Sequence, residues 1–145
     1  MIFLPERFAC EVDALVGSPF RLYGRDPATG IDCIGLVLCA LANAGIGMAL
    51  PCQYRLRNTD ISPFLAFADR LGLERVNAHP TGGDIRLVEI APTQFHLLAL
   101  NQDRQFVHAH AGLRRVVRQT AVPHWHVRAH WRIPHSLEDT WPLLS

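Results

Sequence analysis

The segment from Asp32 to Ala44 is the most apolar stretch of the sequence, and it constrains the fold more than any other. Apolar side chains occupy most sides of a helix drawn through it, so we expect a helix that is buried all round. Asp32 is a favourable N-cap residue and Gly45 is a favourable C-terminal stop. The pattern therefore predicts a central helix over about 32–44, with other elements packed around it.

The apolar periodicity predicts two more helices, at about 5–16 and 62–71, with Pro5 in a first turn and Gly72 as a stop. Further along the chain the pattern changes to short apolar runs of strand character. The runs are 85–90, 95–100, 105–109, 113–119 and 127–133, and the segments 17–30 and 46–60 are predicted loops. Helices followed by a meander of strands indicate an α+β fold.

Length and charge limit the kind of protein that the chain can be. At 145 residues, we expect 1–145 to form a single domain. The formal net charge of +1 argues against a nucleic-acid binder, which would be strongly basic. No window approaches the roughly 20 apolar residues of a membrane span. The N-terminal residues lack the pattern of a secretory signal, so we expect synthesis in the cytoplasm.

Cysteine usage indicates free thiols. The sequence contains Cys10, Cys33, Cys39 and Cys52. Their spacing matches no zinc template, and a domain of this length does not need disulfides to fold. At least one of these thiols is therefore a candidate for chemistry.

Cys33 is the strongest candidate, because it directly follows Asp32 at the first position of the buried helix. Unpaired backbone N–H groups and the positive end of the helix dipole converge there. This setting lowers the pKa of a thiol and makes it a nucleophile. Gly24 and Gly30 in the preceding loop allow the backbone to approach closely. The alternative interpretation is a small buried hydrophobic residue, a common role of free cysteine.

Two histidines complete a candidate catalytic set. His96 lies in one strand-like run and His108 in the next. If residues 101–103 form a three-residue hairpin loop, Leu100 faces Arg104 and His96 faces His108. Directly opposed residues have Cβ atoms about 4.5–5.5 Å apart. One imidazole can then orient the other, as a base that activates a thiol requires.

The same histidines have a metal-binding alternative. His108 with His110, and His124 with His126, are pairs in which alternate strand residues share a face, as zinc ligands could. No cysteine or carboxylate lies at a matching spacing. We therefore expect no metal site and no cofactor.

Four segments resemble motifs of one family, the NlpC/p60 cell-wall cysteine peptidases. Gly17–Val37 is similar to the family's nucleophile motif, in which a G-x-P-Y-x-x-G loop leads to D-C-S-G-L/F-V. Gly83–Leu87 resembles its P-G-D strand, Phe95–Ala99 its H-V-G-I strand and Phe106–Ala109 its F-I-H-A strand. The resemblance covers about residues 8–133, and its motifs occur in the family's order and at the family's separations.

This resemblance implies a trimmed papain-like α+β fold, with the nucleophile at the start of a central helix that packs on an antiparallel sheet. It implies that Cys33 is the nucleophile, His96 the general base and His108 the residue that orients the base. The implied activity is hydrolysis of amide bonds in peptidoglycan stem peptides, typically between D-glutamate and a diamino acid.

Two positions depart from the family pattern. Ile34 stands where the family has serine, and Phe20 stands where the family usually has an aromatic residue with a hydroxyl group. Tyr23 is a candidate to supply that hydroxyl to the substrate. His110 shares a strand face with His108 and is a second candidate substrate-binding residue.

The glycine loop is most similar to that of the branch found on phage tails and gene-transfer particles. This similarity implies a particle-associated enzyme with tail proteins as partners, which opens the periplasmic cell wall during delivery. One alternative is a tail-tip assembly module that keeps the fold and has lost activity. Another is an acyltransferase of the same architecture, which would need an apolar acyl channel.

Overall fold

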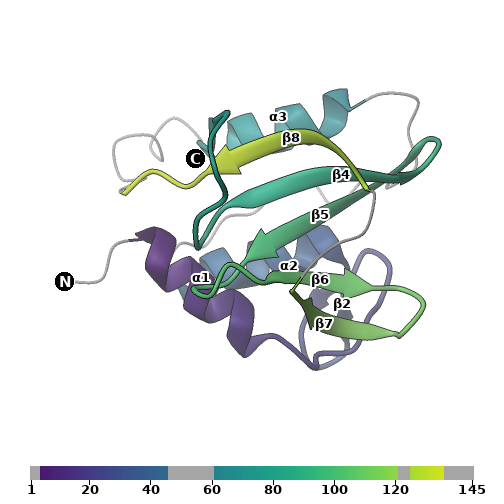
Figure 1. The fold of residues 1–145 in the computed structure, drawn as a ribbon. Helices are drawn as coiled ribbons and strands as arrows, with labels where there is room; N and C mark the ends of the chain where they lie inside the picture. Colours follow the sequence, from purple (N-terminus) through teal and green to yellow (C-terminus); the bar gives the residue numbers. More distant parts are fainter. Residues whose placement is uncertain (1–3, 46–60, 121–124, 136–145) are drawn as a thin grey trace.

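A computed structural model of the chain describes residues 4–45, 61–120 and 125–135 (Figure 1). The predicted loop over 46–60, Cys52 and His124 lie outside the described residues. Within the described part, no helix is both long and apolar enough to span a membrane.

Three helices lie close to their predicted bounds. They are α1 (Leu4–Ala14), α2 (Cys33–Asn43) and α3 (Ser62–Arg70). The predicted cap of the central helix is confirmed, because the Asp32 carboxylate accepts a hydrogen bond of 2.8 Å from the N–H of Gly35. Gly72 follows α3 with φ +72°, the left-handed conformation that favours glycine after a helix.

In the part of the chain that the structure describes, eight strands form two antiparallel sheets. They are β1 (Arg25–Asp26), β2 (Gly30–Ile31), β3 (Glu74–Arg75), β4 (Ile85–Ala91), β5 (Gln94–Leu100), β6 (Phe106–His110), β7 (Arg115–Gln119) and β8 (His126–Arg132). β1 pairs with β2, and the others form a six-stranded sheet in the order β3-β8-β4-β5-β6-β7. The sequence did not predict β1, β2 or β3, because two-residue strands are too short for a period to emerge. The α+β prediction is confirmed.

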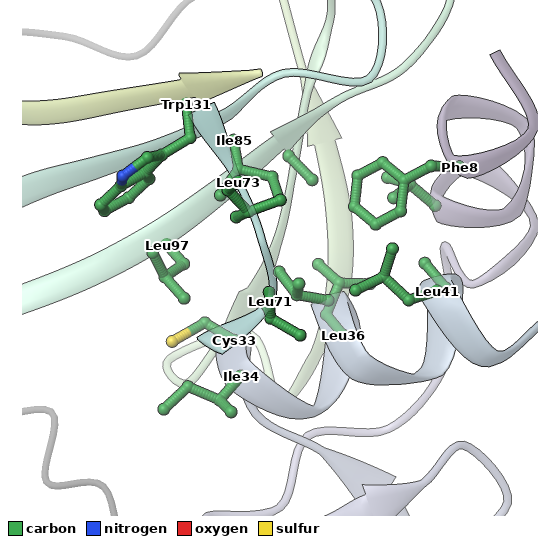
Figure 2. Close-up of a cluster of buried hydrophobic side chains, with 14 of the residues drawn as sticks. Phe8, Cys33, Ile34, Leu36, Leu41, Leu71, Leu73, Ile85, Leu97 and Trp131 are labelled. Atoms are coloured by element: carbon green, nitrogen blue, oxygen red, sulfur yellow. The ribbon is translucent and has the colours of Figure 1, made fainter. Parts of the chain in front are cut away.

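The helices pack on the sheet through one hydrophobic core. α2 and α3 lie behind the strands in Figure 1, and α2 contacts α1, β5 and β6. The buried cluster joins Phe8 of α1, Leu41 of α2, Ile85 of β4, Leu97 of β5 and Trp131 of β8 (Figure 2). Most of α2 is buried, as its composition predicts, and this packing fixes its first turn against β5.

Glycines allow the loop before α2 to pack directly on the helix start. A Cβ atom on Gly35 would lie 2.2 Å from the carbonyl oxygen of Gly24. A Cβ atom on Gly24 would lie 2.0 Å from the carbonyl oxygen of Gly30. Any other residue at either position would collide with the backbone, so the predicted close approach of the loop is confirmed.

The predicted register of the β5–β6 hairpin is wrong by two residues. Leu100 pairs with Phe106 rather than with Arg104, so His96 and His108 are not directly opposed. The loop is longer than predicted because Asn101 closes it, its side-chain oxygen accepting a hydrogen bond of 2.9 Å from the N–H of Gln105. A shift of two residues leaves every side chain on its predicted face, because strands alternate with period two.

Candidate active site

His96 of β5 and His108 of β6 form a hydrogen-bonded imidazole pair. The Nε2 atom of His96 lies 2.9 Å from the Nδ1 atom of His108, and the two rings are nearly perpendicular. The contact runs diagonally across the two strands, since the register is shifted. The predicted meeting of the two rings is therefore confirmed, although the predicted geometry is not.

Gln119 of β7 extends this pair, and the sequence analysis missed it. Its side-chain oxygen is hydrogen-bonded to the Nε2 atom of His108. Val117 is the residue that pairs directly with His108, so Gln119 lies two residues further along on the same face. Only the register of β6 and β7 could have revealed it, and no local pattern in the sequence encodes that register.

Both imidazoles are neutral at pH 7. Burial, with smaller contributions from His108 and His110, lowers the pKa of His96 to about 3. Burial also lowers the pKa of His108, and the bond to Gln119 opposes this only in part. His96 is therefore available as a proton acceptor.

We expect acid to destabilise the fold through His96. Its folded-state pKa of about 3 lies below the unfolded value of 6.5. Between these two pH values the unfolded chain is protonated at His96 and the folded chain is not, so acid favours unfolding. The linkage lowers the free energy of unfolding by about 2 kcal/mol between pH 7 and pH 5. Urea unfolding at the two pH values measures the loss. The His96→Gln variant should lose less, and an equal loss in both proteins would contradict the buried neutral imidazole.

A groove of about 470 Å³ opens beside the imidazole pair. Its described lining consists of Phe20, Ile90, Gln94, Phe95, His96, His108, Ala109, His110, Ala111, Gly112 and Trp125. The Trp125 ring stands edge-on to both imidazoles, with ring centroids 6.3 Å from His96 and 5.7 Å from His108. The described walls are mostly apolar, and their titratable side chains are the three histidines.

The two predicted substrate-binding residues differ in position. His110 lines the groove, as predicted. Tyr23 is 48% exposed and is absent from the described lining. Tyr23 acts through its backbone instead, where its N–H donates a hydrogen bond of 2.9 Å to the Asp32 carboxylate. The structure therefore does not bring the Tyr23 hydroxyl to the groove. Phe20, which has no hydroxyl, is part of the groove lining.

Cys33 begins α2 beside β5, where the backbone N–H of Leu97 donates a hydrogen bond to its sulfur. Its side chain is fully buried, between the side chains of α2 and Leu97 (Figure 2), and is not part of the described groove lining. Among the described residues, the sulfur has no hydrogen bond to His96. His96 and Leu97 are neighbours in a strand, so their side chains point to opposite faces of the sheet.

The predicted lowering of the Cys33 pKa is wrong. Burial, together with the negative charge of Asp32, raises the pKa of the thiol to about 12. The N–H groups of Leu97 and of Cys33 itself act in the opposite direction but are outweighed. The free-energy cost of removing the thiolate from water exceeds the stabilisation that the helix start gives it. The free protein therefore holds a neutral thiol and a neutral imidazole.

A second polar cluster lies around Asp84, just before β4, and is fully buried at its centre. Its carboxylate is 2.7 Å from Nε2 of His130 and accepts hydrogen bonds of 3.0 Å from Arg132 and 2.9 Å from the N–H of Thr81. Burial alone would raise the pKa of Asp84, but these bonds outweigh it and lower the pKa to about 2. The cluster joins β8 to the turn before β4.

Solved structures of NlpC/p60 domains resemble this chain throughout most of its length. NlpC1 from Trichomonas vaginalis matches with TM-score 0.68 and 22% identity over 91% of this chain and 45% of that one. NlpC2 from the same organism matches with TM-score 0.67 and 21% identity over 91% and 47%. The NlpC/p60 domain of the peptidoglycan hydrolase SagA matches with TM-score 0.61 and 17% identity over 89% and 98%.

The chain has the NlpC/p60 fold. It spans less than half of the two Trichomonas vaginalis chains and nearly all of the SagA domain. No family model matches the sequence, and no curated protein matches it either. The likeness therefore lies in the three-dimensional structure.

Within this NlpC/p60 fold, the predicted site residues come together in two groups. His96, His108 and His110 meet at the groove, whereas Cys33 is buried at the start of α2 and is not part of the described lining. The described residues contain no group of three or more histidines, cysteines or carboxylates that could hold a metal ion. The arrangement can accept a proton at the groove, and it can form a covalent bond at Cys33 only if the sulfur is uncovered.

Proposed function

We propose that the chain is a cysteine peptidase that hydrolyses amide bonds in peptidoglycan stem peptides. The observation that carries the proposal is the hydrogen-bonded pair of His96 and His108, which lines a groove. His96 belongs to β5, and Cys33 begins α2 beside the same strand. The fold adds support, because one of its solved neighbours is a domain of a peptidoglycan hydrolase. In this proposal Cys33 is the nucleophile, His96 the base and His108 the residue that orients the base.

The reaction would proceed in two steps. The sulfur of Cys33 attacks the amide carbonyl carbon while His96 takes the thiol proton, since the thiol is neutral in the free protein. The C–N bond breaks, and His96 returns that proton to the leaving amine. His96 then removes a proton from water, whose oxygen attacks the thioester and releases the acid and the thiol. Backbone N–H groups at the helix start stabilise each oxyanion, at about 3–4 kcal/mol per donor.

This mechanism requires substrate binding to uncover Cys33. Its side chain is fully buried, and Cys33 is not part of the described groove lining. A bound peptide must therefore open access to the sulfur before attack.

An inactive assembly module is the second candidate, and the burial of Cys33 favours it. Ile34 and Phe20, which replace polar residues of the family motif, point the same way. Incubation with defined muropeptides, followed by mass spectrometry of the fragments, separates the two. Peptidase activity gives two fragments whose masses sum to the substrate plus one water. Intact muropeptides at high protein concentration would favour the module.

The same assay covers the acyltransferase alternative. The apolar walls formed by Phe20, Ile90, Phe95 and Trp125 are the feature that such an enzyme would need. Adding a small amine to the reaction tests for it. A product in which the amine replaces water would indicate acyl transfer rather than hydrolysis.

We also propose that the protein is made in the cytoplasm and carried on a phage-tail-like particle. There it would open the periplasmic cell wall during delivery. The support is the similarity of the Gly24–Val37 segment to the tail-associated branch of the family. Sedimentation of particles from the host, followed by immunodetection of the chain, tests this proposal. Recovery of the chain only in fractions free of particles would exclude it.

Burial makes Cys33 slow to alkylate in the free protein. A pKa of about 12 leaves about one thiol in 10⁴ ionised at pH 8, and the side chain has no exposed surface. We expect iodoacetamide to modify Cys33 at least about 100-fold more slowly than the exposed Cys10. Timed quenching and peptide mapping by mass spectrometry measure both rates. Comparable rates would contradict the buried thiol, and a rate at Cys33 that rises with added wall peptide would support the peptidase.

A further inference from the structure

Three side chains form a continuous relay across neighbouring strands. His96 of β5 bonds through Nε2 to Nδ1 of His108 on β6, and His108 bonds through Nε2 to the side-chain oxygen of Gln119 on β7. Every nitrogen of the two rings except Nδ1 of His96 therefore has a partner in this relay. The proton positions along it follow from the group at its end.

We propose that Gln119 is a positioning residue, which sets the tautomers of both imidazoles and so makes Nδ1 of His96 the basic nitrogen. The kinetic consequence rests on the proposed function. The tautomer assignment itself does not depend on it.

The assignment follows from donor and acceptor roles. The amide oxygen of Gln119 only accepts hydrogen bonds, so Nε2 of His108 carries a proton. A neutral imidazole has one N–H group, so Nδ1 of His108 is an acceptor. Nε2 of His96 must then donate, which leaves the lone pair of His96 on Nδ1.

Both rings have to be neutral for this logic to hold, and their surroundings keep them so. Burial is the main cause that lowers the pKa of each ring. His110 is the other titratable group of the described lining, and its Nδ1 accepts a hydrogen bond of 3.0 Å from the N–H of Leu113. From α2, Cys33 faces the backbone of β5 as an uncharged thiol. None of these groups competes with Gln119 for His108.

The opposite tautomer would disable the base. If Gln119 donated through its amide nitrogen, Nδ1 of His108 would carry the proton and Nε2 of His96 would accept it. Nδ1 of His96 would then hold a proton, and its Nε2 would be occupied by His108. No nitrogen of His96 would be free to accept the thiol proton. Which atom Gln119 presents therefore decides whether His96 can act.

Nuclear magnetic resonance reads the tautomers directly. In ¹⁵N-labelled protein at pH 7, two-bond ¹H–¹⁵N correlations distinguish protonated from unprotonated ring nitrogens. We expect His96 and His108 both to carry the proton on Nε2. Protonation of both rings on Nδ1 would overturn the proposal.

Two substitutions test the role of Gln119. Gln119→Met keeps the length of the side chain and removes the acceptor, so we expect mixed tautomers and a 10- to 100-fold fall in kcat with little change in KM. Gln119→Glu keeps an acceptor oxygen, so we expect restored tautomers and kcat, with the acid limb of the pH profile moved upward. Gln102→Met, at an exposed glutamine away from the groove, is the matched control and should change neither.

The outcomes separate this proposal from the proposed function. Thermal unfolding of each variant shows whether it is folded. If the wild-type protein hydrolyses no muropeptide, the proposed function fails while the spectra still decide the tautomers. If Gln119→Met keeps wild-type tautomers and activity, the positioning role fails even in an active enzyme.

Discussion

Replacing Cys33 with alanine is expected to reduce muropeptide hydrolysis by at least about 10⁴-fold, because the variant lacks the sulfur that forms the thioester in the proposed mechanism. The fold should survive, since alanine removes only one sulfur from the core and most such substitutions cost about 0.5–3 kcal/mol. The release of free amine from a defined muropeptide measures the activity, and urea unfolding measures the stability.

Cys39→Ala is the matched control for this experiment. Cys39 lies on the same helix, and its sulfur donates a hydrogen bond of 3.1 Å to the carbonyl of Arg25, away from the groove. We expect this variant to keep full activity. Undiminished hydrolysis by Cys33→Ala would exclude Cys33 as the nucleophile, whatever the measured stability of the variant.

Replacing Asp84 with alanine is expected to lower the free energy of unfolding by roughly 3–5 kcal/mol. The variant leaves the buried Nε2 atom of His130 without its partner, and it removes the acceptor for Arg132 and for the N–H of Thr81. The lower part of this range is expected, because the Arg132 side chain is 32% exposed and water can replace part of its lost bond. Urea unfolding at pH 7 measures the effect.

Asp103→Ala is the comparison, since Asp103 lies exposed in the loop between β5 and β6. Its loss should be within about 0.5 kcal/mol. Equal effects at the two positions would show that the buried cluster contributes nothing beyond an ordinary surface carboxylate. The contribution of Asp84 is present above the unfolded pKa of 3.8 and is lost as the pH falls toward about 2.

The burial of Cys33 links the fold to the choice between peptidase and assembly module. A buried Cys33 with a raised thiol pKa is typical of a residue that only fills the core. Cys33 is also the first residue of α2, beside the strand that carries His96, which is the position expected of a nucleophile. Turnover of a muropeptide is therefore the deciding measurement, because slow alkylation of the free protein is expected in both cases.

Local patterns in the sequence determined the central helix, its Asp32 cap, the order of the helices and the longer strands, and the face on which His96 and His108 lie. These features depend on neighbours a few residues away, such as the apolar period and the Asp32 side chain that reaches the N–H of Gly35. A strand face survives even an error of two residues in register. The sequence was therefore sufficient to find the imidazole pair.

Only the tertiary structure decided the register of the β5–β6 hairpin, the part played by Gln119 and the protonation of Cys33. Gln119 reaches His108 because β7 pairs with β6, which is a long-range choice. The pKa of the Cys33 thiol depends on how completely the core excludes water from it, and burial there outweighed the favourable helix start. Desolvation is a property of the whole packed molecule, so no local motif can encode it.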